Sequence, residues 1–157
     1  MIAKDHTFSS ERLTYRGIAR DDAETIVMWR SRPENYRTFF ADRPITLEEH
    51  LQWFEAYLAD ETRFDFMIVC ADGRRIGTVS LSHVGSETCE VSYLIGEEDA
   101  RGKGFATEAV RAMCSLAVGE LGATSIEARI RPENEPSAHV ALAAGFTEEE
   151  RVFRLHV

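Results

Sequence analysis

The stretch that decides the fold is residues 89–121, which read CEVSYLIGEEDARGKGFATEAVRAMCSLAVGEL. Residues 89–95 predict a strand, because alternate apolar side chains would share one face. A polar turn follows, and then a run that contains two glycines, residues 101–107. Apolar residues next recur at helical spacing, and Gly122 is a typical residue just past a helix end. The stretch therefore predicts a strand, a glycine-rich turn and a helix.

A glycine-rich turn before a helix is an arrangement that binds phosphate, because backbone N–H groups can approach an anion at the positive end of the helix. Two common phosphate loops do not fit. The nucleoside-triphosphate loop needs Ser or Thr after its Lys, but Gly104 follows Lys103. The dinucleotide fingerprint needs a third glycine where Thr107 stands. The run instead fits the pattern [QR]-x-x-G-x-[GA], with Arg101 and Ala106 at its ends.

Composition limits the class of protein. The 157 residues suit one domain, and 44% hydrophobic with 29% charged residues is typical of globular chains. The net charge of −9 disfavours general nucleic-acid binding and favours a cationic partner such as an amine. No apolar run approaches the roughly 18 residues of a membrane span, and residues 1–11 lack the apolar core of a secretion signal. We therefore expect a cytoplasmic protein with no membrane partner.

The three cysteines, Cys70, Cys89 and Cys114, lie in apolar segments and lack the spacing of metal ligands. We expect reduced thiols in the core and no bound metal. None has an evident His partner or a helix N-terminus, so the sequence does not favour a cysteine nucleophile.

The rest of the chain predicts a loose arm at residues 1–11 and a single domain at residues 12–157. The expected strands are residues 12–18, 64–71, 75–84, 89–95, 125–130 and 152–157. The expected helices are residues 22–29, 46–58, 106–121 and 137–144, with residues 35–40 helical or irregular. Thr46 and Glu49 predict a capping box for the second helix. The apolar stripe expected on that helix is Leu47, Leu51, Phe54 and Leu58.

The order β-α-α-β-β-β-α-β-α-β and three short runs resemble the GNAT N-acetyltransferases, in particular the RimJ/RimL-like branch. The runs are RGKGFA at 101–106, NEPS at 134–137 and LAAGF at 142–146. The resemblance covers residues 13–157. It implies an α/β (α+β) fold, with a mixed, mostly antiparallel sheet flanked by helices. It also implies acetyl-CoA as co-substrate and direct transfer of the acetyl group to a primary amine in a ternary complex.

The resemblance implies that backbone amides of the glycine-rich run hold the CoA pyrophosphate, and that the pantetheine arm follows the end of the preceding strand. A free backbone N–H at Leu94 or Ile95 would bind the thioester carbonyl, and Asn134 would contact the pantetheine. The expected CoA-binding residues are Leu94, Ile95, Gly96, Arg101, Gly102, Lys103, Gly104, Phe105, Ala106, Thr107, Asn134 and Ser137.

Acetyl transfer needs a polarised carbonyl, a deprotonated amine and a stabilised leaving thiolate. Glu90, eleven positions before Arg101, is the expected base; the alternative is a solvated glutamate on the polar face of the strand. His83 could relay a proton through water or simply end its strand. Ala141 stands where many GNAT enzymes have a Tyr. Ser137 is therefore the expected partner of the thiolate, unless it only caps the last helix.

Residues 29–54 resemble the amino-sugar nucleotide N-acetyltransferases of pseudaminic-acid synthesis. In that group an Arg and a His contact phosphate, and aromatic side chains stack on the base. The alternative is that Phe39 and Trp53 are core residues and His50 is a helix-surface residue. The expected acceptor-side residues are Arg30, Phe39, Phe40, His50, Trp53, His83 and Tyr93.

The expected acceptor is accordingly an amino-sugar nucleotide or another small amine. A protein N-terminal amine and an antibiotic or polyamine amine are the alternatives. Because Ala141 replaces the usual Tyr, a non-catalytic acyl-CoA-binding module is a further alternative. The sequence leaves monomer and homodimer open.

Overall fold

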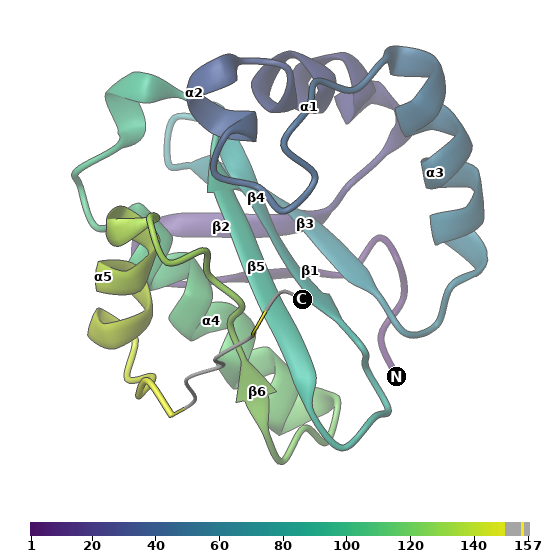
Figure 1. Cartoon of the computed structure of the whole chain (residues 1–157). Coiled ribbons are helices and arrows are strands. Elements are labelled where there is room, and N and C mark those ends of the chain that lie inside the picture. Colours follow the sequence, from purple (N-terminus) through teal and green to yellow (C-terminus); the bar gives the residue numbers. More distant parts are fainter. Residues whose placement is uncertain (150–154, 156–157) are drawn as a thin grey trace.

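The computed structural model describes residues 1–149 and residue 155, and it contains one six-stranded sheet with helices on both faces (Figure 1). The order of strands in the sheet follows the chain, and every pairing is antiparallel except that of β5 with β6. The strands are β1 Thr7–Ser9, β2 Leu13–Gly17, β3 Phe64–Cys70, β4 Arg75–Ser82, β5 Cys89–Ile95 and β6 Ile126–Glu127. The helices are α1 Ala23–Arg30, α2 Pro33–Tyr36, α3 Leu47–Ala59, α4 Phe105–Glu120 and α5 Glu135–Ala143. This is the mixed, mostly antiparallel α/β fold that the sequence predicts.

The first strand corrects one expectation. Thr7–Ser9 lies in the stretch expected to be a loose arm, yet it pairs with β2 as the edge of the sheet. The physical reason is Phe8, whose ring stacks on Tyr15 at 4.7 Å and meets Phe66 edge-on at 4.9 Å. The buried aromatic contact anchors a segment whose flanking residues are exposed.

The sheet separates two apolar cores. On one face, α4 packs against a large core that includes Tyr15, Phe66 and Met113. On the other face, α1 and α3 cover a smaller core around Trp29 and Met67, both of which are fully buried. Among the described residues no helix is long and apolar enough to cross a bilayer.

The buried face of α3 differs from the expected stripe. Phe54 is buried as expected, but His50 and Tyr57 accompany it, while Leu47 and Leu58 are 38% and 48% exposed. Positions 50, 54 and 57 recur at helical spacing, and this line of residues faces the smaller core. The predicted cap is confirmed, since the Glu49 N–H donates to Thr46 Oγ1 over 3.1 Å.

The start of α1 contains a buried carboxylate, Asp22. Asp22 occupies the cap position, but its side chain does not cap the helix. The buried carboxylate instead accepts hydrogen bonds from the Ala19 N–H at 2.8 Å and from the guanidinium groups of Arg16 at 2.8 Å and Arg75 at 3.1 Å. Asp22 therefore joins α1 to two strands of the sheet.

The parallel pair at the far edge of the sheet is short. β5 and β6 share only the pairs Cys89 with Ile126 and Glu90 with Glu127. The strand expected at residues 125–130 therefore ends early, and beyond Glu90 no strand pairs with this side of β5 within residues 1–149. The last expected strand, residues 152–157, falls almost wholly outside the described residues. The early end of β6 opens a space beside β5.

Candidate active site

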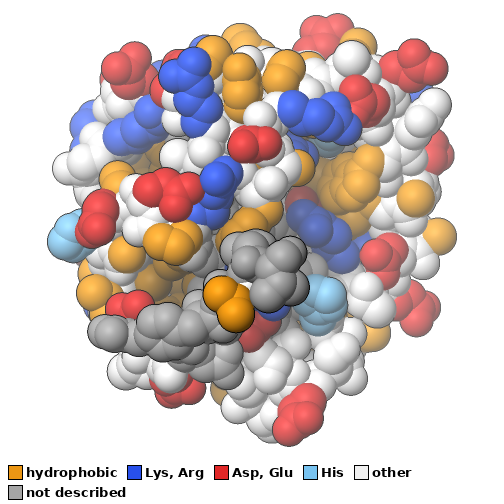
Figure 2. Space-filling view, in the orientation of Figure 1, with side chains coloured by type: hydrophobic (Ala, Val, Ile, Leu, Met, Phe, Trp, Pro, Cys, Tyr) orange, Lys and Arg blue, Asp and Glu red, His pale blue; other side chains and the backbone are white. Residues whose placement is uncertain are grey.

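A cavity of about 800 Å³ lies along this opening. It is lined by β5, by the glycine-rich run before α4, by α5 and by residues 38–41 after α2. Figure 2 shows this face of the molecule, where hydrophobic atoms are visible in the hollows between charged side chains. Arg131, in the segment after β6, donates to the Phe39 carbonyl oxygen over 2.9 Å. This contact ties the two walls of the cavity together.

The glycine-rich run has the geometry of an anion site. Gly102 and Gly104 adopt left-handed φ angles of 73° and 80°, and α4 begins at Phe105. Arg12 Nη1 donates to the Lys103 carbonyl oxygen over 2.8 Å. Since a trans peptide points its C=O and N–H in opposite directions, the Gly104 N–H is directed away from Arg12. Together with the unpaired amides of the first turn of α4, it suits the diphosphate of CoA.

A second group of residues holds this run in place, and the sequence analysis did not identify it. Glu108, in the first turn of α4, accepts from Arg12 Nε at 2.7 Å, from the Arg12 N–H at 2.8 Å and from Ser10 Oγ. Burial by itself would raise the pKa of Glu108, but the hydrogen bonds from Ser10 and Arg12 together outweigh it and lower the pKa. Arg12 therefore bridges the run and the helix that follows it.

Arg101 is one of the expected CoA-binding residues, and it lines the cavity. Its guanidinium donates to the Ile95 carbonyl oxygen at 3.1 and 3.2 Å and to Asn35 Oδ1. The side chain thus joins the end of β5 to α2, and its guanidinium is engaged within the protein. Lys103 is exposed and remains the cation of the run.

The register of β5 decides which amides face the cavity. Gly96 N–H donates to the Ile76 carbonyl oxygen over 2.8 Å, and hydrogen-bonded pairs alternate along an antiparallel ladder. Leu94 therefore turns its N–H toward β4, whereas Tyr93 and Ile95 turn theirs toward the cavity. The prediction that the Leu94 N–H binds the thioester carbonyl is therefore wrong. The N–H of Ile95 stays a candidate for this role, and the N–H of Tyr93 is a second one.

Gly96 is required for packing. Besides its amide bond to β4, its carbonyl oxygen accepts from Arg32 Nη1 over 2.9 Å. A Cβ at this position would lie 2.1 Å from the ring of Trp29. Both backbone groups of Gly96 are thus engaged within the protein, so its expected contact with pantetheine is not supported.

The two candidates for proton transfer lie together. Glu90 lines the cavity, and its Oε2 is 3.6 Å from His83 Nε2. The side chain of Glu90 is 23% exposed and that of His83 is 63% exposed. His83 alone among the described non-glycine residues has a positive φ, 57°, at the end of β4. The pair therefore connects the cavity with solvent.

At the start of α5, Asn134 caps the helix, and the Ser137 hydroxyl is not needed for the cap. The helix begins at Glu135, and Asn134 Oδ1 caps it by accepting from the Ser137 N–H over 3.3 Å. The alternative that the Ser137 hydroxyl is the cap is therefore wrong. That hydroxyl lies 3.0 Å from the Tyr93 hydroxyl, and both residues line the cavity. Burial raises the pKa of Tyr93, although its hydrogen bond with Ser137 opposes the shift.

The expected acceptor-side residues only partly converge. Arg30 and Phe39 line the cavity, with the guanidinium 5.5 Å from the ring centroid, and Phe40 beside them is 69% exposed. His50 is buried against Trp53, with ring centroids 5.5 Å apart, so it is not a helix-surface residue. Neither His50 nor Trp53 lines the cavity.

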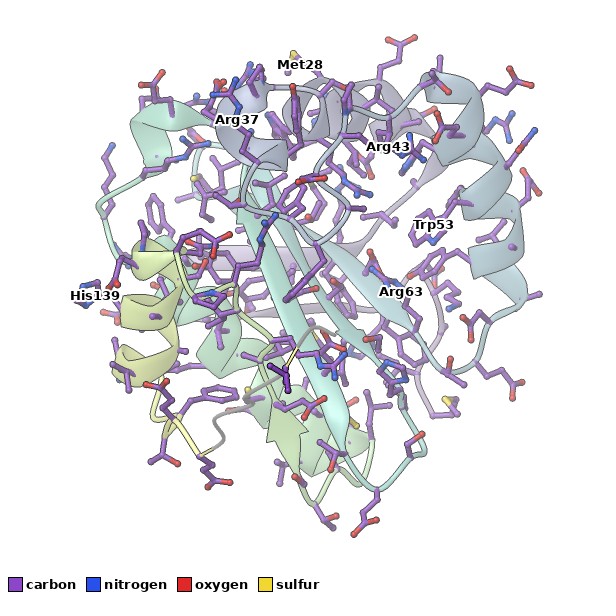
Figure 3. All side chains as sticks on the ribbon, viewed as in Figure 1. Met28, Arg37, Arg43, Trp53, Arg63 and His139 are labelled. Atoms are coloured by element: carbon purple, nitrogen blue, oxygen red, sulfur yellow. The ribbon has the colours of Figure 1, made fainter. Side chains whose placement is uncertain are left out.

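Arginines that the sequence analysis missed surround this cluster. Arg63 makes a two-point ion pair with Asp65 at 2.7 and 3.2 Å and lies 5.4 Å from the Trp53 ring (Figure 3). Burial lowers the pKa of Arg30, and the charges of Arg63 and Arg43 add to this shift while the charge of Asp65 opposes it. Within the described residues the Arg30 guanidinium makes no hydrogen bond. Among the described residues, Arg30 is therefore a cation beside the cavity without an ion-pair partner, whereas Arg63 and Arg43 are each paired with a carboxylate, Asp65 and Glu49.

The cysteines take no part in this arrangement. All three are free thiols, and none lines the cavity. Burial raises the pKa of Cys114 to about 11 and raises that of Cys70. Neither of these two is a thiolate near neutral pH.

The chain is similar in sequence to known proteins. The chain is 33% identical over 147 residues to a probable N-acetyltransferase of Bacillus subtilis, an alignment that covers 91% of this chain and 77% of that protein. It is 32% identical over 118 residues to human alpha/beta-tubulin N-acetyltransferase 9, covering 66% of this chain. The chain spans 57% of the length of that human protein and 29% of a further relative from Methanocaldococcus jannaschii.

A solved structure shows the same fold. Spermidine N-acetyltransferase from Vibrio cholerae, in complex with CoA and spermine, superimposes with a TM-score of 0.82 at 22% identity, covering 88% of this chain and 82% of that one. The family model described as an acetyltransferase (GNAT) domain matches residues 12–147. With a matching family model over most of its length, the chain belongs to the GNAT acetyltransferase family.

Proposed function

We propose that this protein transfers the acetyl group of acetyl-CoA directly to a primary amine inside the cavity between β5 and α5. One observation carries the proposal: a single cavity is lined both by the glycines of the anion site, Gly102 and Gly104, and by the carboxylate of Glu90. Cofactor binding and proton removal would therefore occur in one continuous space.

The residues of the cavity support each requirement of the reaction. The N–H groups of Tyr93 and Ile95 face the space in which a thioester carbonyl would take up negative charge. Glu90 would take a proton from the bound ammonium so that the neutral amine can attack, and His83, 3.6 Å away and largely exposed, would pass that proton to solvent. Lys103 and the amides before α4 would hold the diphosphate.

The acceptor proposed here is an amine that also carries an anionic group, as an amino-sugar nucleotide does. Support comes from charge: Arg30 lines the cavity without a hydrogen-bond or ion-pair partner among the described residues. A polycation such as spermidine would be repelled at this end of the cavity. The aromatic side chains of Phe39 and Phe40 offer a surface for a planar base.

The proposal is tested by measuring release of free CoA thiol with acetyl-CoA and a panel of acceptors. The panel contains amino-sugar nucleotides, the corresponding sugars without phosphate, peptides with free N-termini, and spermidine. Arg30→Ala should raise the KM for an amino-sugar nucleotide about tenfold or more and leave the KM for the uncharged sugar unchanged. Preferred turnover of spermidine or of peptides, with no effect of Arg30→Ala, would contradict the anionic acceptor.

The role of Glu90 is tested separately. Glu90→Gln should reduce kcat about 100-fold or more and keep CoA affinity, because it removes only the proton acceptor. Glu127→Gln is the matched control, since Glu127 is paired with Glu90 in the sheet but is not among the residues that line the cavity. Equal turnover in the two variants would rule out Glu90 as the base.

A further inference from the structure

The hydrogen bond between Tyr93 and Ser137 is a polar contact inside the cavity that the steps above do not use. Its two hydroxyl oxygens lie 3.0 Å apart, one on β5 and the other on the first turn of α5. Both side chains line the same cavity as the anion site and Glu90. A partly buried pair of hydroxyl groups in this position can stabilise a leaving group that becomes negative.

We infer that Tyr93 presents the hydroxyl that stabilises the departing thiolate of CoA, with Ser137 as the residue that positions it. The inference rests on the proposed acetyl transfer. It gives Tyr93 a catalytic role, whereas the sequence suggested only that this residue lies near the acceptor.

The placement of α5 supports this assignment. Ser137 and Ala141 are four residues apart on one face of the helix, and both line the cavity. Ala141 has no polar group, so this face of α5 offers only the short serine hydroxyl there. The Tyr93 side chain arrives from the opposite wall, with its ring packed against the larger core. Strand β5 thus places the phenol of Tyr93 beside the first turn of α5, and α5 itself has no tyrosine at position 141.

The protonation state of Tyr93 suits a donor. Burial raises the pKa of Tyr93, so the phenol keeps its proton near neutral pH. The hydroxyl of Ser137 can donate to the phenol oxygen, which leaves the phenol proton free to point into the cavity. This arrangement would strengthen the phenol as a donor, because hydrogen bonds in a chain polarise one another.

The role of Tyr93 in the step is a hydrogen bond and not a net proton transfer. After Glu90 has passed the ammonium proton to solvent through His83, the neutral amine nitrogen forms its bond to the carbonyl carbon and gives a second proton to Glu90. The carbon–sulfur bond then breaks, and its electron pair remains on sulfur. Tyr93 donates its hydrogen bond to that sulfur as the charge grows, and the sulfur later takes a proton from solvent.

The test uses CoA alone and needs no acceptor, so it separates this inference from the proposed function. The thiol of bound CoA is titrated through the ultraviolet absorbance of its thiolate, in the intact protein and in Tyr93→Phe. Loss of the hydrogen bond should raise the pKa of the bound thiol by about one unit, a tenfold change in its acidity. Tyr36→Phe is the matched control, because Tyr36 is not among the residues that line the cavity.

Two further measurements complete the test. With an identified acceptor, Tyr93→Phe should lower kcat about 10-fold to 100-fold, while affinity for a CoA analogue without sulfur stays unchanged. Ser137→Ala should shift the thiol titration in the same direction but less, since it only positions the phenol. An unchanged titration in Tyr93→Phe would overturn the inference. A larger shift in Ser137→Ala than in Tyr93→Phe would make the serine the donor and would also overturn it.

Discussion

Replacing Gly104 by Ala should separate the conformational role of this glycine from its role in CoA binding. Gly104 has a φ of 80°, and a Cβ there would come no closer than 3.4 Å to Arg12 Nη2. The side chain fits, so the cost is conformational, about 1 kcal/mol for a non-glycine residue in the left-handed region. For a chain of this size, that loss lowers Tm by about 2–4 °C.

In the Gly104→Ala variant, the strained loop can relax if residue 104 rotates toward negative φ. This rotation would turn the N–H of residue 104 away from the diphosphate. One hydrogen bond to a charged oxygen is worth about 1.5–3 kcal/mol, so CoA affinity should fall about tenfold to a hundredfold. Gly122, just past the other end of α4, has a φ of 70° and open space around a Cβ. Gly122→Ala is therefore a control with equal strain and no contact with the cavity.

The assay pairs thermal unfolding without ligand with calorimetric titration of CoA. We expect both variants to lose similar stability and only Gly104→Ala to lose affinity. If Gly104→Ala bound CoA as tightly as the unmodified protein while Tm fell, the left-handed geometry of the run would have no part in binding. The assignment of the anion site would then be refuted.

Three further predictions concern contacts that position the site. Glu108→Gln should weaken CoA binding severalfold, because a neutral acceptor holds Arg12 less firmly; binding of pantetheine, which has no diphosphate, should stay unchanged in a competition assay. Asp22→Asn should cost about 2 kcal/mol or more of unfolding free energy at neutral pH, since it breaks a buried ion pair. Burial by itself would raise the pKa of Asp22, but the hydrogen bonds that it accepts outweigh burial and lower the pKa below 3.8. The ion pair therefore stabilises the fold fully above about pH 4, and this stabilisation is lost as the pH falls through the pKa of the folded state. Denaturation curves should accordingly show a shallower acid decline for Asp22→Asn than for the unmodified protein. Gly96→Ala should lower stability by about 1–3 kcal/mol by overpacking Trp29, and near-ultraviolet circular dichroism should report the displaced indole.

Much of the fold follows from local patterns. Alternation predicts β5 with its observed bounds, and the apolar spacing together with Gly122 predicts α4 to within one residue at each end. Local hydrogen bonding likewise decides the Thr46 cap of α3. These features depend on residues within a few positions of one another, so a single sequence contains the necessary information.

The α3 stripe shows where local patterns fail. Leucines at 47, 51 and 58 and aromatic residues at 54 and 57 define two overlapping apolar faces on one helix. Periodicity alone does not say which face meets the sheet. The structure buries the face with His50 and Tyr57, because Tyr57 and Phe54 pack with Met67 in the smaller core.

By itself, the sequence determined the strand–glycine run–helix unit, the family resemblance and the candidate anion site, since each depends on residues close together in the chain. Only the tertiary structure decided which groups are available for chemistry. It turned the N–H of Leu94 into the sheet, directed Arg101 to Ile95, joined Arg12 to Glu108 and placed the phenol of Tyr93 beside Ser137. The last two contacts join residues 96 and 44 positions apart. Such pairings depend on strand register and on how helices pack on the sheet, which no local pattern encodes.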